Sequence, residues 1–191
     1  TTSNLTLMGT ITVDASGSSN KAAILLKGTA DTTVTLKIDT SVEITTGDEQ
    51  VAGIMVYFDI PELPGINRRS NITISAPLTF DATDTFLLVN YSETGQMDIS
   101  ADADITGSIY SAYFSKQEDL PDNPNHGTKQ KININASITG CLITNGTVNL
   151  QDKAKVLFPS NIDVENPEVY KGFTGGRRRY VPVPGSWRVV W

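Results

Sequence analysis

Short runs in which apolar and polar residues alternate constrain the fold more than any other feature of the sequence. The runs, such as those that contain Val34, Leu36 and Ile38 or Ile72 and Ile74, are four to six residues long and end in Gly, Asp, Asn or Ser. Alternation with a period of two places the apolar side chains on one face of a strand. Thr, Val and Ile dominate these runs, and β-branched residues favour strands. The sequence therefore predicts an all-β chain.

An internal repeat favours a solenoid over the other all-β folds. Ile99, Ala103, Ile105 and Gly107 align at a constant offset of 33 with Ile132, Ala136, Ile138 and Gly140. One such unit cannot bury its apolar face alone, whereas stacked units can. We predict a single-domain parallel β-solenoid of about five to seven coils, wound in the commoner, right-handed sense. A sandwich or jelly roll is the alternative fold.

The repeat also predicts which side chains face the interior. The expected inward residues, stacked in register between neighbouring parallel coils, are Ile99, Ala101 and Ile105 with Ile132, Ile134 and Ile138. Ala103 and Ala136 are expected where the interior is narrowest, because a larger side chain would not fit there.

Two polar, turn-rich segments and an irregular end interrupt the pattern. We interpret 59–70 and 114–130 as loops inserted into the coils. Without the second loop the repeat shortens to about 20 residues, the length expected of one coil. The alternation fails near residue 158. We therefore assign 1–158 to the solenoid and 159–191 to an irregular C-terminal strap, with Trp187 and Trp191 packed on the solenoid.

Composition excludes several classes of protein. The 191 residues suit one domain, and the net charge of −6 argues against nucleic-acid binding through overall basicity. Cys141 is the only cysteine, so no intramolecular disulfide can form, and we interpret it as a small buried hydrophobic residue. No apolar run approaches the ~20 residues that span a bilayer. Because the chain begins with Thr, we expect that a leader or anchor has been removed, which favours an extracellular or cell-surface location.

The candidate catalytic and metal-binding residues are few. Three acids of one coil are expected on its outward face, as a catalytic pair or a Ca²⁺ site would require: Asp98, Asp102 and Asp104. The next coil has Asn and Ser at the corresponding positions, so a solvated face is the simpler interpretation. His126 is the only histidine and lies in the 114–130 loop. We expect no catalytic residue, metal or cofactor.

One basic cluster and five glycosylation sequons could mediate binding. Arg177, Arg178 and Arg179, with Lys171 nearby, lie among aromatic residues, and such groups bind phosphates and stack on bases. The alternative is structural pairing with acids of the tail. The sequons are at Asn4, Asn71, Asn90, Asn135 and Asn145.

The second half of the chain resembles a known family. The coils containing Ile-Thr-Gly at 97–158, a Gly-rich turn at 175–176 and the ending Val-Pro-Gly-Ser-Trp-Arg at 183–188 resemble the C-terminal β-solenoid region of PilX-class minor pilins of type IV pili. In that family the solenoid precedes an irregular segment ending in Pro-x-x-Trp-(Arg). Two features depart from it: the long N-terminal hydrophobic helix is not present, and Phe158-Pro159 stands where Tyr-Asp-Pro is common.

The resemblance implies a role on the cell surface or in a filament, without a catalytic site. We expect the extracellular structural or adhesive head of a type IV pilus-associated, or other surface-filament, protein, with other filament subunits as partners. The 59–70 and 114–130 loops would make its contacts. The first alternative is a binding module for DNA or anionic glycan that uses Arg177–Arg179. The second is a polysaccharide-active β-helix enzyme.

Overall fold

The structure is a computed structural model that describes residues 3–7, 11–12, 24–29, 32–45, 52–58, 68–80, 86–113 and 129–157. The strands form three sheets. The first contains β1 (Ser3–Leu7), β4 (Thr33–Ile38), β7 (Arg69–Ile74), β10 (Thr94–Ile99), β13 (Lys129–Ile134) and β16 (Thr147–Leu150). The second contains β2 (Ile11–Thr12), β5 (Val42–Thr45), β8 (Leu78–Phe80), β11 (Asp104–Thr106), β14 (Ser137–Thr139) and β17 (Lys155–Leu157). The third contains β3 (Ile24–Gly28), β6 (Ala52–Phe58), β9 (Phe86–Asn90), β12 (Ser108–Ser111) and β15 (Leu142–Thr144).

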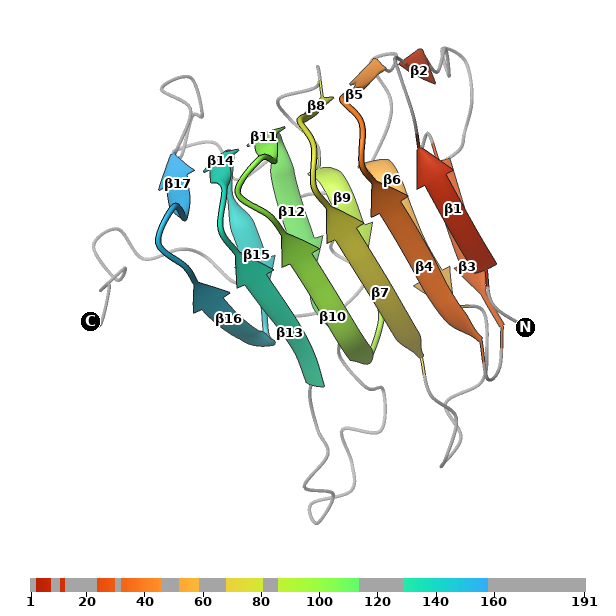
Figure 1. Ribbon diagram of the computed structural model, residues 1–191. Helices are drawn as coiled ribbons and strands as arrows, with labels where there is room; N and C mark the ends of the chain where they lie inside the picture. Colours follow the sequence, from red (N-terminus) through yellow and green to blue (C-terminus); the bar gives the residue numbers. More distant parts are fainter. Residues whose placement is uncertain are drawn as a thin grey trace, which may run out of the picture. The chain divides into compact units, whose positions relative to one another are not determined.

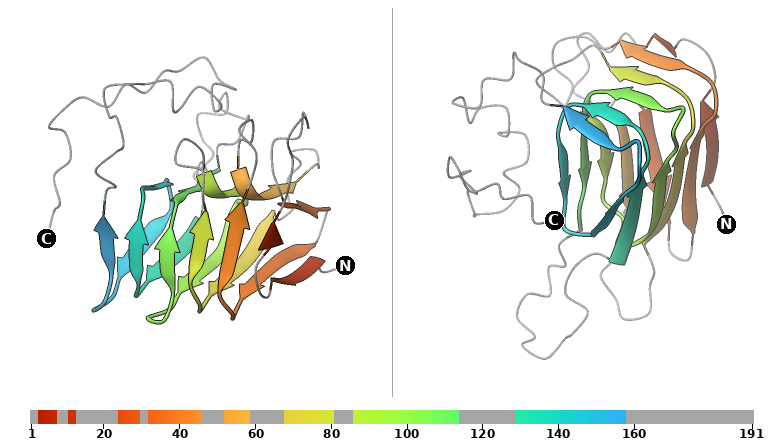
Figure 2. Two further views of the ribbon diagram at one scale, coloured as in Figure 1. Left: turned by 90° about the horizontal axis from the view of Figure 1, so that it is seen from above. Right: turned by 60° about the vertical axis from the view of Figure 1, so that its left-hand side comes forward.

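The chain winds through the three sheets in turn, so this is a parallel β-solenoid. Each strand pairs in parallel with the strand three places along the chain, and no described pair is antiparallel. Among the described residues there are five coils of three strands, and β16 and β17 begin a sixth. Figure 1 shows the strands of the first sheet side by side, and Figure 2 shows the sheets enclosing an interior. The predicted all-β class with parallel coils is confirmed and a sandwich is excluded, whereas the right-handed winding stays a prediction.

The core consists of apolar columns that run from coil to coil. In the first sheet, one column aligns Leu36, Ile72, Met97 and Ile132, all of them buried. The second sheet adds Val42, Leu78, Ile105 and Ile138, and the third adds Ile54, Leu88 and Ile109. Fully burying each such side chain stabilises the fold by roughly 1.5–3 kcal/mol. The alternating pattern thus produces a continuous core.

Glycine turns the chain from the second sheet into the third in two coils. Gly107 and Gly140 have φ angles of +137° and +156°. A Cβ on Gly140 would lie 2.3 Å from the Gly107 carbonyl oxygen. Only glycine combines this backbone conformation with such close packing, which explains the Ile-Thr-Gly repeat and confirms the predicted glycine corner.

The predicted register is correct in two sheets and wrong in the first. Ile105 pairs with Ile138, as the offset of 33 requires, but Ile99 pairs with Ile134 rather than Ile132. The corner after Ile99 is two residues longer than the corner after Ile134, and Ala101 lies half-buried in a turn there instead of facing inward. Ala103 and Ala136 are buried, as predicted.

The predicted boundaries of both loops also change. Arg69–Ser70 begins β7 and Lys129–Gln130 begins β13, so the insertions are shorter than predicted. Residues 59–67, 114–128 and 158–191, with the predicted strap, Trp187 and Trp191, lie outside the described residues. No helix in the described ranges is long and apolar enough to span a membrane.

Candidate functional site

Two of the insertions leave the coil at the same corner, where the third sheet leads back to the first. Residues 59–67 join β6 to β7 and residues 114–128 join β12 to β13, whereas Tyr91–Glu93 alone join β9 to β10 between them. We call the described residues at this edge the loop corner: Arg68, Tyr91–Glu93, Ala112–Tyr113 and Asn145–Gly146. Loops carried by a rigid scaffold are common sites of recognition. The loop corner is therefore the candidate functional site.

A buried arginine joins neighbouring coils at the loop corner. Arg68 precedes β7, and its carbonyl oxygen accepts hydrogen bonds from the amides of Glu93 (2.8 Å) and Thr94 (3.0 Å). Its Nη1 atom lies 3.8 Å from Oε2 of Glu93, and its Cζ atom lies 5.6 Å from the ring centroid of Tyr113. A buried guanidinium requires such compensation. These contacts fix the chain directly after the 59–67 insertion.

Three aromatic rings, from β9, β12 and the Tyr91–Glu93 connection, pack against one another. Tyr110 contacts Phe86 and Tyr91 edge to face, with ring centroids 5.7 and 5.8 Å apart. Burial, and to a smaller extent Tyr110, raise the pKa of Tyr91 to about 12. Burial also raises the pKa of Tyr110. Both phenols are consequently neutral at physiological pH and act as rigid, partly exposed aromatic groups.

An asparagine holds the start of the second insertion. Oδ1 of Asn145 accepts from the amide of Tyr113 (3.2 Å), and its Nδ2 donates to the carbonyl oxygen of Tyr113 (2.8 Å). The side-chain amide thus pairs with the backbone as a neighbouring strand would. Residues 114–128 therefore begin from a fixed point on the next coil.

A buried polar cluster supports the loop corner from inside the coil: Ser70, Asn90, Ser92, Ser111 and Gln130. The hydroxyls of Ser70 and Ser92 share a hydrogen bond of 2.7 Å. Asn90 Nδ2 donates to Ser111 Oγ (3.1 Å), and Gln130 Nε2 donates to Ser92 Oγ (2.8 Å) and to the Ser92 carbonyl oxygen. Ser111 Oγ donates to Gln130 Oε1. A network connected in this way rigidifies the interior.

The three predicted acids lie outward on one coil, but they do not share one strand face, so that part of the prediction is wrong. Asp98 lies on β10 in the first sheet, Asp104 lies on β11 in the second, and Asp102 lies in the turn between them. Asp98 accepts hydrogen bonds from Gln96 Nε2 (2.8 and 2.9 Å) and Asn133 Nδ2 (2.7 Å). No group of three His, Cys, Asp or Glu side chains in the described ranges could hold a metal ion.

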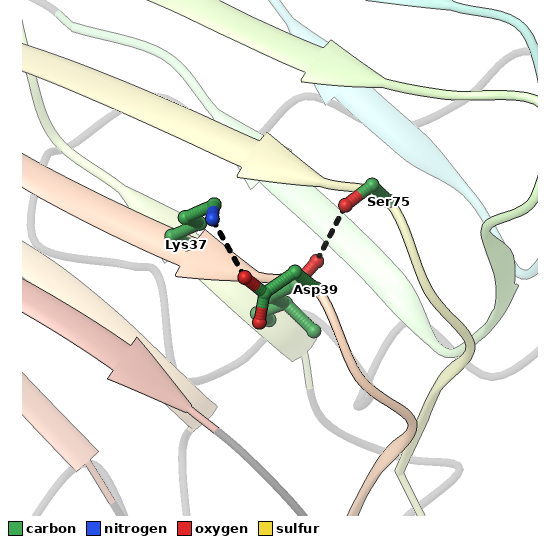
Figure 3. A network of polar contacts seen from close by, with 4 residues as sticks. Lys37, Asp39 and Ser75 are labelled. Carbon is green, nitrogen blue, oxygen red and sulfur yellow. Dashed lines mark hydrogen bonds and ion pairs between the residues drawn. The ribbon is translucent and has the colours of Figure 1, made fainter.

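A separate polar group lies at the end of β4 and contacts the next coil through Ser75. Lys37 Nζ lies 2.6 Å from Oδ2 of Asp39, and the Ser75 hydroxyl donates to the Ile38 carbonyl oxygen at 3.2 Å (Figure 3). The hydrogen bond from Lys37 lowers the pKa of Asp39. Both charged groups are substantially exposed, and exposed ion pairs contribute little to stability.

The sequons differ in their environment. Asn4 and Asn145 are exposed, whereas Asn71 and Asn135 are half-buried. Asn90 belongs to the buried polar cluster, with 2% of its surface exposed. A glycan requires an amide that faces solvent, so Asn90 would have to leave the cluster to carry one.

The remaining candidate residues are Cys141, which the structure describes, and four basic groups and one histidine, which lie outside the described residues. Cys141 is half-buried between β14 and β15, and burial raises the pKa of its thiol. A thiol of this kind is a poor nucleophile at neutral pH. His126, Lys171 and Arg177–Arg179 lie outside the described residues.

The sequence prediction missed the residues of the loop corner. The sequence signal that could have found them is their position in the alternating pattern, that is, whether a residue falls on an inward or an outward position. Arg68 and Ser70 are in phase with the inward Ile72, and Tyr113 is in phase with Ile109. Polar and aromatic residues in the inward phase at a coil boundary indicate a buried polar corner.

Comparison with protein-family models, with curated proteins and with solved structures gives no match for this chain.

Proposed function

We propose that the chain is the extracellular structural or adhesive head of a type IV pilus-associated, or other cell-surface filament, protein. In this proposal the insertions at 59–67 and 114–128 contact the target surface, and other filament subunits are its partners. The observation that carries the proposal is that both insertions leave one rigid corner of the solenoid. The resemblance of residues 97–158 and 183–188 to minor pilins supports the filament context.

The register shows that both segments are additions to a coil that is complete without them: for 114–128, Ser111 pairs with Asn90 and Lys129 pairs with Thr94, which only three residues separate from Asn90. Val56 pairs with Asn90, and Arg69 pairs with Thr94. Continuing these pairings by one or two residues aligns Phe58 with Ser92 and Arg68 with Glu93. Residues 59–67 thus have no counterpart in the next coil. Long insertions that a fold does not require are typical of recognition loops.

The positions of the acids favour contact over polysaccharide cleavage. A glycosidase needs two carboxyl groups roughly 5–10 Å apart that face one substrate. Asp98 and Asp104 lie on different sheets, and amide donors occupy Asp98. We therefore rank the contact role above the enzymatic one.

The proposal is tested by deleting 59–67 and 114–127, separately and together, from the full chain. After the deletions, three residues join the paired ends of β6 and β7, and three join those of β12 and β13. This is the length of the Tyr91–Glu93 connection between β9 and β10, which the solenoid already accommodates. Microspheres coated with each protein are applied to epithelial-cell monolayers, and bound microspheres are counted. We expect at least a tenfold loss of adhesion for the double deletion, with an unchanged circular-dichroism spectrum.

The matched control replaces residues 81–85 with a single glycine. These residues join β8 to β9 at a different corner, where the next coil turns through Gly107 alone. The control should adhere as the full chain does. Failure of the full chain to adhere, or equal adhesion by the double deletion, would contradict the proposal.

A further inference from the structure

The last described coil leaves part of the apolar core uncovered. Val148, Leu150 and Val156 are in register with Ile132, Ile134 and Ile138, which are fully buried. They are nevertheless 36%, 65% and 39% exposed, and the adjacent Leu157 is 51% exposed. We call these four residues the open end. In the right-hand view of Figure 2, β16 and β17 lie at the front of the stack.

The opposite end of the solenoid is different. Among the described strands, β1 and β3 also have a neighbour on one side only, yet the inward Leu7 and Leu26 are only 6% and 8% exposed, and Leu5 and Ile24 are partly buried. The two ends are therefore not equivalent. Among the described inward residues of the two ends, the most exposed one, Leu150 at 65%, lies at the end formed by β16 and β17.

An open end of this kind needs a cover. Among the described strands, β15, β16 and β17 are the last of their sheets, so each has one edge that no described strand pairs with. Solenoids close such ends with a terminal cap whose outer face is polar. Apolar side chains grouped beside strand edges otherwise promote association.

We propose that residues 158–191 of this chain cover the open end. The segment continues directly from Leu157, at the open end itself. It contains both tryptophans of the chain and further aromatic residues: Phe158, Tyr170, Phe173, Tyr180, Trp187 and Trp191. The coil from Lys131 to Thr147 takes 147 − 131 = 16 residues, whereas 191 − 157 = 34 residues follow Leu157. The segment is long enough to cross this end more than once.

The asymmetry of the ends favours this segment over a second copy of the chain. Stacking copies head to tail would join the open end to the β1–β3 end, and both surfaces would then have to be free in the single chain. The inward Leu7 and Leu26 at the β1–β3 end are already buried, and Leu5 and Ile24 are partly buried, so that end offers less apolar surface than the open end. A cover supplied by the chain itself requires no second open surface.

Tryptophan fluorescence tests the proposal in the full chain, because both tryptophans lie within 158–191. The test variant is Leu150→Ser, at the open end. The control is Leu25→Ser, which makes the same chemical change at a leucine that is 55% exposed on β3. The emission maximum and acrylamide quenching are measured on dilute protein, and analytical ultracentrifugation reports the association state.

We expect blue-shifted, poorly quenched emission in the full chain and in the control. In Leu150→Ser the emission should shift to the red, with at least a twofold rise in the quenching constant, while the protein is still monomeric. Emission typical of solvent-exposed tryptophan in the monomeric full chain would overturn the proposal. So would identical quenching in both variants, or a dimer that Leu150→Ser dissociates, which would identify a second copy as the occupant. Circular dichroism confirms that each variant is folded.

Discussion

Gly140 occupies a position that no other residue can take without strain. Its φ angle is +156°, and an added Cβ would lie 2.3 Å from a backbone oxygen. We predict that Gly140→Ala lowers the free energy of unfolding by about 1–3 kcal/mol, measured by urea denaturation. The neighbouring, half-buried Cys141→Ala is the control and should cost less than Gly140→Ala. Equal effects would show that the corner does not require glycine.

Ala136 tests how closely the interior is packed. The side chain is 1% exposed between neighbouring coils. We predict that Ala136→Leu overpacks this layer and costs about 1–3 kcal/mol, visible as a lower melting temperature. Ala101→Leu makes the same change in the half-exposed turn of the preceding coil, and its melting temperature should be nearly unchanged. A neutral Ala136→Leu would place this residue outside the core.

Because Tyr91 is half-buried, we predict that the free energy of unfolding falls in alkaline solution. Its pKa rises from 10.0 to about 12, mainly through burial. Between these values the unfolded chain releases the phenolic proton and the folded chain keeps it, so the free energy of unfolding falls as pH rises. We expect the urea midpoint to fall between pH 10 and pH 12, and to fall less in Tyr91→Phe. Identical pH profiles would contradict burial of this ring.

At the scale of the strands and corners, coils of different length share one register. The corner Ser100–Asp104 has two residues more than the corner Asn135–Ser137 of the next coil, yet the flanking strands pair on both sides. We predict that deleting Ala101 and Asp102 changes the free energy of unfolding by less than about 1 kcal/mol, because loop length contributes little to stability. Deleting Asn135 and Ala136 from the shorter corner should instead prevent folding. Thermal melts distinguish the two deletions.

The alternation in the sequence was sufficient to predict strands and parallel coils, but not the register of every strand. A shift of two residues keeps the same side chains facing inward, so pairing Ile99 with Ile132 or with Ile134 buries isoleucine in both cases. The glycines were unambiguous, because Gly107 and Gly140 mark a fixed backbone conformation. Corner lengths, which decide the register, are not specified by apolar periodicity.

The candidate site was predicted only in part. The insertions could be located from their polar, turn-rich composition, although their boundaries were displaced into β7 and β13. The contacts of Arg68 with Glu93 and Tyr113 join residues from different coils, so they depend on the register and could not be read from local sequence. Gln130 was assigned to a loop because it is polar, although it lies two residues before Ile132 and therefore on an inward position of the strand.

At the scale of the whole molecule, the C-terminal segment should stabilise the solenoid. We predict that deleting 181–191, with Trp187 and Trp191, lowers the melting temperature and promotes association on size exclusion, because core residues lose their cover. Replacing Arg177, Arg178 and Arg179 with alanine should leave the melting temperature unchanged. A truncated chain that is monomeric and melts as the full chain does would contradict a structural role for this segment.

The central claim is that a rigid solenoid makes its contacts through the loop corner. Hydroxyl-radical footprinting of the full chain, free and adsorbed on epithelial-cell monolayers, measures this directly. We predict protection of 59–67, 114–128 and the half-exposed Tyr91 and Tyr113, with Asn4 and Leu25 labelled equally in both states. Protection of Asn4 and other outward residues of the first sheet, with unchanged labelling at the loop corner, would contradict the claim.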